Sequence, residues 1–305
     1  MADRVLVLNP VSGNENHTEW ISSRAREHGF DVRTTDCAGD ARRLAREGAA
    51  ASADLVAAAG GDGTVNEVVN GLYAGDALAE TTVAVVPAGT GNNFAANVGV
   101  ESVDAAFEVI ENGERRRIDL GIATDRAFVN SCVGGITAEA STATTPTGKR
   151  TFGVLAYALQ TLETVTSFDP LPLAVTLETT AGSDDRWTGE AMFVLVGNCR
   201  RFTSARRAQA NVEDGLFEVT IVEEAPPTNL VGDAALAWLF DDPDSSHVIR
   251  RRVPGLTVET RHDDPVEYTL DGEPLEAGRL ELETSANILE VAVGDGYRPN
   301  PDAGR

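Results

Sequence analysis

The chain has 305 residues, of which 42% are hydrophobic, and it carries a formal net charge of −23. At about 100–200 residues per domain, this length predicts two domains with ample core. No apolar run approaches the ~20 residues that a membrane-spanning helix needs. The acid excess disfavours a nucleic-acid partner, because binding a phosphate backbone requires clustered cations. The short apolar stretch near the start is interpreted as a first strand rather than a signal peptide.

Three cysteines, Cys37, Cys132 and Cys199, lie far apart and form no CxxC pair. An odd, scattered set disfavours disulfides and a thiolate zinc site, and it predicts a cytoplasmic protein. The four histidines show no metal-ligand spacing, so we expect them in surface or core positions.

Acidic residues outnumber basic ones by 48 to 25, and Lys149 is the single lysine. The acids are scattered, which argues against a disordered acidic tail. An ordinary solvated surface is one interpretation. We favour adaptation to a high-salt cytoplasm, because acid excess and near-absence of lysine occur together and salt screens repulsion between like charges.

The first part of the chain alternates strands with helices, joined by short turns. This order predicts a parallel sheet with helices on its faces, an α/β domain over residues 1–117. The expected strands are 4–10, 30–35, 54–59 and 82–87, and the expected helices are 18–28, 38–48, 65–73, 93–97 and 103–112.

From about residue 118 to 305 the pattern changes to short strand-like runs divided by Gly, Asp and Pro. It predicts a mainly antiparallel domain, a β-sandwich. The expected strands are 116–123, 126–135, 171–180, 187–199, 214–224, 255–261, 265–275 and 279–286. Two helices, 149–165 and 230–240, interrupt them. The last strand, near 287–297, fits either the sandwich or a return to the first domain, and the tail after Arg298 is expected to be loose.

The segment "LVAAAGGDGTVNEVVNGL" is a buried strand that ends in glycines and continues as a helix. Gly60, Gly61 and Gly63 allow the backbone to approach a ligand, and a helix start there offers N–H groups to an anion. A carboxylate at Asp62 would repel phosphate, unless a magnesium ion or ordered water lies between them. Thr64 and Glu67 have the spacing of a capping box.

The same device recurs where "VAVVPAGTGNNFAANVG" ends a strand in Gly89, Thr90 and Gly91, and "NPVSGN" ends the first strand. Adjacent parallel strands would bring these turns to one sheet edge, where ligands bind in α/β folds. Three such turns favour a phosphate-binding cradle over unrelated tight turns. Neither GxxxxGK[ST] nor GxGxxG is present, so the cradle is not a P-loop or a dinucleotide fingerprint.

Five motifs, "NPVSGN", "GGDGTVNEVVNGL", "PAGTGNNFA", "DGLFEV" and "LDGEPLE", occur in one order across almost the whole chain. In order and spacing they resemble the diacylglycerol kinase catalytic-domain family, soluble lipid kinases related to sphingosine kinases. GGDGT alone is shared with NAD kinases and phosphofructokinases, whereas the set of five is specific. The resemblance implies ATP binding by the first domain, lipid binding by the sandwich, and Mg²⁺ as a cofactor.

Residue by residue, the resemblance implies three groups. The nucleotide site would use Asn9, Thr35, Gly60, Gly61, Asp62, Gly63, Thr64, Val65, Asn66, Glu67 and Thr90. A structural magnesium would be held by Asp214 with the backbone carbonyls of Asn211 and Leu216. The acid/base pair would be Glu273, as the better candidate for proton acceptor, and Asp271. One departure concerns the first turn, where many relatives have a basic residue and this chain has Asn14 and Glu15.

Local sequence also supports plainer interpretations of these acids. Asp214–Gly215 is typical of a simple turn, and Asp271–Gly272 between apolar runs is a strong hairpin signal. If residues 271–273 were extended, the side chains of Asp271 and Glu273 would share a face.

The resemblance further implies a lipid substrate with a free hydroxyl, diacylglycerol-like or an archaeal dialkylglycerol, and a role in lipid metabolism. We expect a cytoplasmic protein with transient, peripheral contact at the inner membrane face and no nucleic-acid partner, and a homodimer is left open. The helix at 149–165 either borders a lipid cleft or packs into the core. The alternatives are an NAD kinase-like enzyme and a nucleotide-binding regulator without catalysis.

The charge balance generates a prediction about salt. Self-repulsion among the excess acids should destabilise the fold in dilute buffer, and screening should relieve it. We therefore expect the melting temperature to rise from low salt to molar KCl, measured by circular dichroism. A flat or falling melting temperature would contradict the high-salt interpretation.

Overall fold

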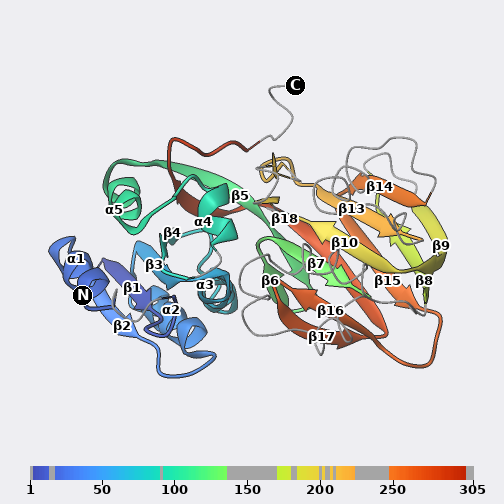
Figure 1. Cartoon of the computed structure of the whole chain (residues 1–305), viewed down its shortest axis with the longest axis horizontal. Helices are drawn as coiled ribbons and strands as arrows, with labels where there is room; N and C mark the ends of the chain where they lie inside the picture. Colours follow the sequence, from blue (N-terminus) through green and yellow to red (C-terminus); the bar gives the residue numbers. More distant parts are fainter. Residues whose placement is uncertain are drawn as a thin grey trace. The chain divides into compact units, whose positions relative to one another are not determined.

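The computed structural model describes residues 3–13, 18–89, 92–135, 170–179, 184–198, 201–202, 207–208, 211–223 and 247–299. They belong to two compact units (Figure 1). Unit 1 comprises Met1–Leu120, Val212–Asp214 and Ser285–Arg305, and unit 2 comprises Gly121–Asn211 and Gly215–Thr284. The helices expected at 149–165 and 230–240 lie outside the described residues, as do Thr90 and residues 300–305 of the tail.

Unit 1 is built on a parallel sheet in the order β2-β1-β3-β4-β18. Its strands are β1 (Arg4–Leu8), β2 (Asp31–Thr34), β3 (Leu55–Gly60), β4 (Thr82–Pro87) and the end of β18 (Arg279–Val293). Every residue of β3 is buried, which accounts for its unbroken run of apolar residues, because a central parallel strand is covered on both faces. Val291 of β18 pairs with Val83 of β4.

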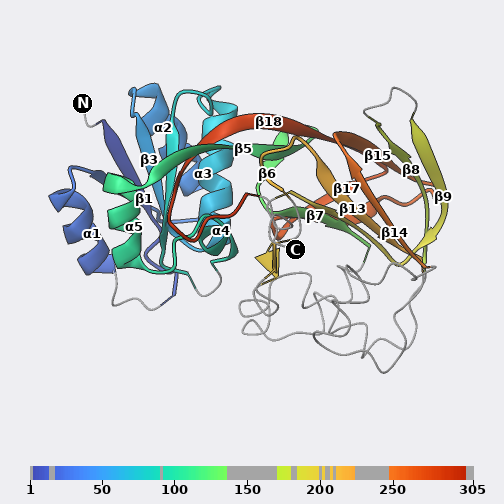
Figure 2. The ribbon, with the colours of Figure 1, turned by 90° about the horizontal axis from the view of Figure 1, so that it is seen from above.

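Helices cover both faces of this sheet (Figure 2). They are α1 (Thr18–Glu27), α2 (Asp40–Ala50), α3 (Asp62–Ala74), α4 (Asn93–Asn97) and α5 (Val103–Asn112). The His28 ring, just after α1, stacks on Phe107 of α5 with centroids 5.0 Å apart. On the other face α3 crosses α2 at Gly71, where an added Cβ would overlap the carbonyl oxygen of Arg42. Only glycine permits this close helix crossing.

The strand order defines a switch point between β1 and β3. The chain leaves β1 in one direction to form β2, then crosses back to form β3 and β4 on the other side. Right-handed crossovers then place α1 on one face and α2 and α3 on the other. In open α/β sheets, ligands bind where the strand order reverses, outside the carboxyl ends of the strands. The turns that follow β1 and β3 flank this point.

Unit 2 is an antiparallel β-sandwich. One sheet has the order β14-β13-β10-β7-β16-β17, and the other contains the start of β18 followed by β15, β8 and β9. The strands are β7 (Ser131–Gly134), β8 (Leu171–Leu177), β9 (Asp185–Ala191), β10 (Phe193–Gly197), β13 (Phe217–Val222), β14 (Val248–Val253), β15 (Gly255–Thr260), β16 (Val266–Leu270) and β17 (Glu273–Ala277). β5 (Glu114–Ala123) pairs with β6 (Arg126–Phe128), and β11 (Arg201–Phe202) with β12 (Arg207–Ala208).

The inner faces of the two sheets of unit 2 form its hydrophobic core. Phe128 and Phe217 stack with ring centroids 5.6 Å apart, and Tyr268 is buried with them. Alternate residues of the strands supply this core, as in Leu256 and Val258 or Leu280 and Leu282. The predicted fold class, an α/β domain with a parallel sheet and an antiparallel β-sandwich, is confirmed.

Several elements differ from the sequence-based expectation. β14 was not predicted, because three consecutive arginines, Arg250 to Arg252, hide the alternation of its apolar residues. The runs near 279–286 and 287–297 form one strand, β18, in which Asn287 has a φ of 52°. The buried carboxylate of Asp119 accepts the Asn287 N–H at this irregular point, at 2.7 Å. No helix in the described part of the chain has the length and apolarity needed to cross a membrane.

Candidate functional site

Three turns of unit 1 meet at the carboxyl end of its sheet, and their backbones are linked. The N–H of Asn9, which begins the turn after β1, donates to the carbonyl of Ala59 at 2.9 Å. The N–H of Ala88, after β4, donates to the carbonyl of Gly60 at 3.1 Å. The turn after β3 is therefore hydrogen bonded on both sides, and the three turns form one connected surface at the switch point.

Glycine is required where these turns touch. A Cβ added at Gly89 would overlap Gly61 Cα and lie 2.7 Å from Gly61 N. Gly13 has a φ of +69°, and a Cβ there would overlap the carbonyl oxygen of Ala88. Because the atoms in the way are backbone atoms, they cannot rotate aside as a flexible side chain would. The recurrence of glycine in these turns thus reflects direct packing of backbone against backbone.

The N-terminus of α3 lies within this surface. Its N-cap is Gly61, which has no side chain to cap the helix, and the N–H groups of Thr64 and Val65 turn back to the Gly61 carbonyl. A Cβ added at Gly63 would meet nothing within 4 Å, so space is open beside the first turn. Backbone N–H groups and the helix dipole make such an end suited to an anion.

Asp62 has a role that the sequence did not indicate. Its Oδ2 accepts the N–H of Asn93 at 3.0 Å, and its Oδ1 accepts the N–H of Phe94 at 2.9 Å. The carboxylate thereby satisfies the first-turn amides of α4, which the helix cannot satisfy itself. A magnesium ion or water is not needed to explain an acid at this position, because the N–H groups at the start of α4 stabilise the Asp62 carboxylate.

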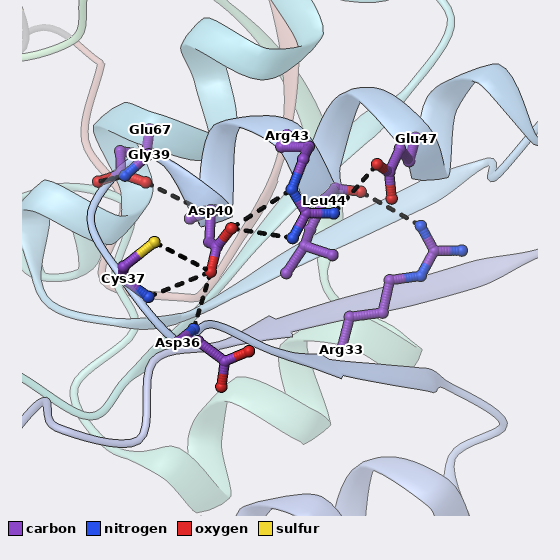
Figure 3. Close-up of polar contacts among 10 residues, drawn as sticks. Arg33, Asp36, Cys37, Gly39, Asp40, Arg43, Leu44, Glu47 and Glu67 are labelled. Atoms are coloured by element: carbon purple, nitrogen blue, oxygen red, sulfur yellow. Dashed lines mark hydrogen bonds and ion pairs between the residues drawn. The ribbon is translucent and has the colours of Figure 1, made fainter.

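The expected capping box is wrong, since α3 begins at Asp62 and Thr64 lies inside its first turn. Glu67 instead reaches the start of α2, where its two carboxylate oxygens accept the N–H groups of Gly39 and Ala41, each at 3.1 Å (Figure 3). The side chain therefore caps a neighbouring helix rather than its own. Sequence spacing could not reveal this, because the partner lies 26–28 residues away.

The other expected nucleotide residues of unit 1 lie on the same turns or on α3. Asn9 Nδ2 donates to the hydroxyl of Thr64 at 3.3 Å, which joins the first turn to α3. Thr35 follows β2 and is buried, and its N–H donates to the carbonyl of Leu8 at 2.9 Å. Val65 and Asn66 are buried within α3, so their side chains shape the turn from behind.

The hairpin signal at residues 270–273 of unit 2 is correct. Leu270 of β16 pairs with Glu273 of β17, and the two residues between them have positive φ, 51° at Asp271 and 95° at Gly272. A two-residue turn of this kind joins twisted antiparallel strands, and Asp-Gly is among its preferred sequences. The segment is therefore not extended, and the expectation that Asp271 and Glu273 share a face of an extended strand is wrong.

Asp271 is held by backbone amides of the neighbouring strand connection. Its Oδ2 accepts the N–H of Val129 at 2.6 Å, and its Oδ1 accepts those of Asn130 and Ser131 at 2.8 and 2.9 Å. Its own N–H donates to the Ser131 carbonyl at 3.0 Å. The carboxylate thus fixes the segment between β6 and β7 against the hairpin.

Glu273 differs from Asp271 in exposure. It is the first residue of β17 and lies exposed, directly after the hairpin that Asp271 fixes. An exposed carboxylate is accessible to a hydroxyl group that approaches from solvent. The two acids that the sequence treated as a pair therefore occupy different environments.

The segment 211–216 precedes β13 and forms a turn in which Gly215 has a φ of 71°. This is the turn that local sequence indicates for Asp214–Gly215. Within the described ranges, no group of three or more His, Cys, Asp or Glu side chains is placed to hold a metal ion. A site made of one carboxylate and the carbonyls of Asn211 and Leu216 is of a different kind and stays a prediction.

The two parts of the chain match two different family models. Residues 3–123 match the family described as "Diacylglycerol kinase catalytic domain". Residues 130–293 match the "YegS C-terminal NAD kinase beta sandwich-like domain". A protein of Pseudomonas aeruginosa named "Probable lipid kinase YegS-like" is 33% identical over 96% of this chain and 95% of its own. The chain therefore belongs to the diacylglycerol kinase catalytic-domain family.

Further comparisons agree with this membership. A protein of Bacillus subtilis named "Diacylglycerol kinase" is 30% identical and covers 88% of each chain. A crystal structure described as a diacylglycerol kinase of Bacillus anthracis aligns with a TM-score of 0.76 at 23% identity, over 96% of this chain and 97% of that one. Another structure from the same organism has a TM-score of 0.82 at 24% identity, over 97% and 98%. At these identities the structures establish the likeness of fold.

The contact between turns generates a prediction for Gly89→Ala. The new methyl group would overlap the Gly61 backbone and displace the turn at the start of α3. We expect ATP to raise the melting temperature of the wild type but not that of Gly89→Ala, because such a rise requires ligand bound to the native state.

The matched control is Gly75→Ala at the end of α3, where an added Cβ would lie 3.4 Å from its nearest neighbours, Arg46 Cγ and the Gly71 carbonyl oxygen. This variant should keep the ATP-induced shift. A full shift in Gly89→Ala would show that nucleotide binding does not depend on the contact between these turns.

Proposed function

We propose that this protein is an ATP-dependent lipid kinase that transfers the γ-phosphoryl group of MgATP to a hydroxyl of a lipid. Membership of the family supports kinase chemistry and a lipid as its substrate. The observation that carries the proposal is the set of linked turns at the switch point of unit 1, with the uncapped N-terminus of α3 among them. Backbone N–H groups at such a position bind phosphate without a lysine.

In this proposal the turn residues bind the nucleotide through the backbone. Gly60, Gly61 and Gly63 allow close approach of the triphosphate, and Asn9 joins the first turn to α3 through Thr64. Thr35 and Thr90 contact the nucleotide from the loops after β2 and β4, as the family resemblance implies. Asp62, Val65, Asn66 and Glu67 act by shaping these elements, since their side chains are buried or occupied by neighbouring amides.

The chemical step requires a base for the attacking hydroxyl. Glu273 is proposed to take the proton of the lipid hydroxyl. The hydroxyl oxygen then attacks the γ-phosphorus, and the bond from that phosphorus to the β–γ bridging oxygen breaks to release ADP. Asp271 is proposed as a positioning residue, because its carboxylate already accepts three backbone N–H groups. The division of roles follows from exposure at one acid and hydrogen bonding at the other.

Magnesium enters in two ways. With ATP it forms the substrate complex and offsets charge on the phosphates. A second, structural ion is proposed at Asp214 with the carbonyl oxygens of Asn211 and Leu216. An all-oxygen donor set of this kind suits a hard cation, which would stabilise the turn before β13.

The acceptor is proposed to be a diacylglycerol or a dialkylglycerol, reached by transient contact with the cytoplasmic membrane face, and assembly as a homodimer is left open. The direct test is to incubate the protein with labelled ATP, magnesium and total lipid extract of the host, and to identify the labelled product. Label in a lipid supports the proposal. Label in added NAD would instead indicate the NAD kinase-like alternative, and ATP binding without any labelled product would indicate a regulator.

The two acids of the hairpin should respond differently to loss of charge. Glu273→Gln keeps the shape but removes the base, so kcat should fall about 10²–10⁴-fold while ATP affinity is unchanged. Asp271→Asn loses acceptors for backbone N–H groups, which typically costs about 1–3 kcal/mol, so its free energy of unfolding should fall as well.

Glu276→Gln is the matched control, because Glu276 is another exposed acid of β17. It should retain wild-type kcat and stability. Near-normal kcat in Glu273→Gln would require that the base be sought elsewhere.

A further inference from the structure

The loop between β2 and α2, residues Thr35 to Gly39, is exposed beyond Thr35 yet held by side chains of two different helices (Figure 3). From α2, Asp40 Oδ2 accepts the N–H groups of Asp36 at 2.9 Å and Cys37 at 3.1 Å. The other oxygen of Asp40 accepts two N–H groups of Arg43, at 2.9 and 3.3 Å. These donors, the Asp36 amide first among them, hold the pKa of Asp40 below its usual range.

From α3, Glu67 adds the remaining connection. Its oxygens accept the N–H groups of Gly39 and Ala41, the residues on either side of Asp40. Gly39 has a φ of +85°, a left-handed conformation that directs the chain into α2. Together the two carboxylates accept four backbone N–H groups, those of Asp36, Cys37, Gly39 and Ala41, so both ends of this loop are held.

Asp40 and Glu67 therefore connect the loop to different parts of unit 1. Asp40 organises the loop locally, whereas Glu67 connects it to the helix whose first turn carries Gly61 to Thr64. Glu67 lies five positions after Asp62 on α3, so one helix carries both the glycine turn and the contact with the loop after β2. The loop begins at Thr35, which follows β2 at the same sheet edge as the other turns.

We propose that Glu67 is a positioning residue for nucleotide binding, which sets the loop after β2 relative to the phosphate-binding turn of α3 by accepting the N–H groups of Gly39 and Ala41. This inference rests on the proposed nucleotide site and adds to it. Glu67 does not touch the nucleotide, since both of its oxygens are engaged by α2. It aligns the loop after β2 with the glycine turn at the start of α3, the two parts proposed to contact the nucleotide.

Cys37 provides a reporter within the loop. Its thiol is exposed and donates to Asp40 Oδ2 at 3.6 Å, and the nearby negative charge of Asp40 raises the pKa of the Cys37 thiol. Only the thiolate reacts with an alkylating reagent, so this contact slows alkylation at neutral pH. When the loop separates from Asp40, the thiol pKa falls toward its ordinary value and alkylation becomes faster.

The experiment compares alkylation of Cys37 by iodoacetamide in the wild type, Glu67→Gln and Glu47→Gln, with the modified cysteine identified by peptide mass mapping. Each rate is measured over a series of MgATP concentrations, without lipid. Glu47→Gln is the matched control, because it makes the same change on α2 at an exposed residue that pairs with Arg43 and not with the loop after β2 in the described part of the chain. Should Glu67→Gln fail to fold, Glu67→Asp keeps the charge on a shorter side chain that cannot reach both amides.

We expect MgATP to slow alkylation in the wild type and in Glu47→Gln at the same half-protecting concentration. In Glu67→Gln the rate without nucleotide should rise, and the half-protecting concentration should rise about tenfold, as expected for the loss of one charge-assisted hydrogen bond. The loss should fall more on KM for ATP than on kcat for the lipid, because Glu67 acts on nucleotide binding and not on the attacking hydroxyl.

Equal rates and equal half-protecting concentrations in Glu67→Gln and the wild type would overturn the inference, as would absence of protection by MgATP in the wild type. A melting-temperature shift with MgATP separates these results from the proposed function. If that shift is present while protection is absent, nucleotide binding holds and the inference alone fails. If neither is present, the nucleotide site itself is wrong.

Discussion

The site of unit 1 depends on close backbone packing at the start of α3. Gly61 lies against Gly89, and no side chain fits between them. With the two turns in contact, the first turn of α3 is near enough to α4 for Asp62 to cap it, and one turn further along Glu67 caps α2. A single helix therefore sets the position of two others through carboxylate–amide hydrogen bonds.

This arrangement also explains where an anion can bind. The starts of α2 and α4 already face carboxylates supplied by α3, whereas α3 begins at a glycine without a capping side chain. Glu67 and Asp62 thus occupy the N-termini of α2 and α4, where the helix dipole attracts a negative charge. Of these three helix N-termini, that of α3 has open space beside Gly63 in its first turn, and it is the one proposed to bind phosphate.

Unit 2 applies the same chemistry to a hairpin. Asp271 accepts three backbone N–H groups and so fixes the turn that presents Glu273. An acid that accepts several backbone N–H groups is suited to holding structure, and the exposed acid on the strand beside it is the one proposed to take a proton. In both units, then, carboxylates that look catalytic in the sequence are used to bind backbone amides.

Short-range patterns in the sequence were enough to predict the alternating strands and helices, the Asp271–Gly272 hairpin, the glycine turns and the family. It did not reveal β14, where arginines obscure the pattern, nor the partners of Asp62 and Glu67. Tertiary structure decided those partners, because a carboxylate binds whichever unsatisfied amide the fold brings within about 3 Å. Spacing along the chain carries no information about an amide 26 or more residues away.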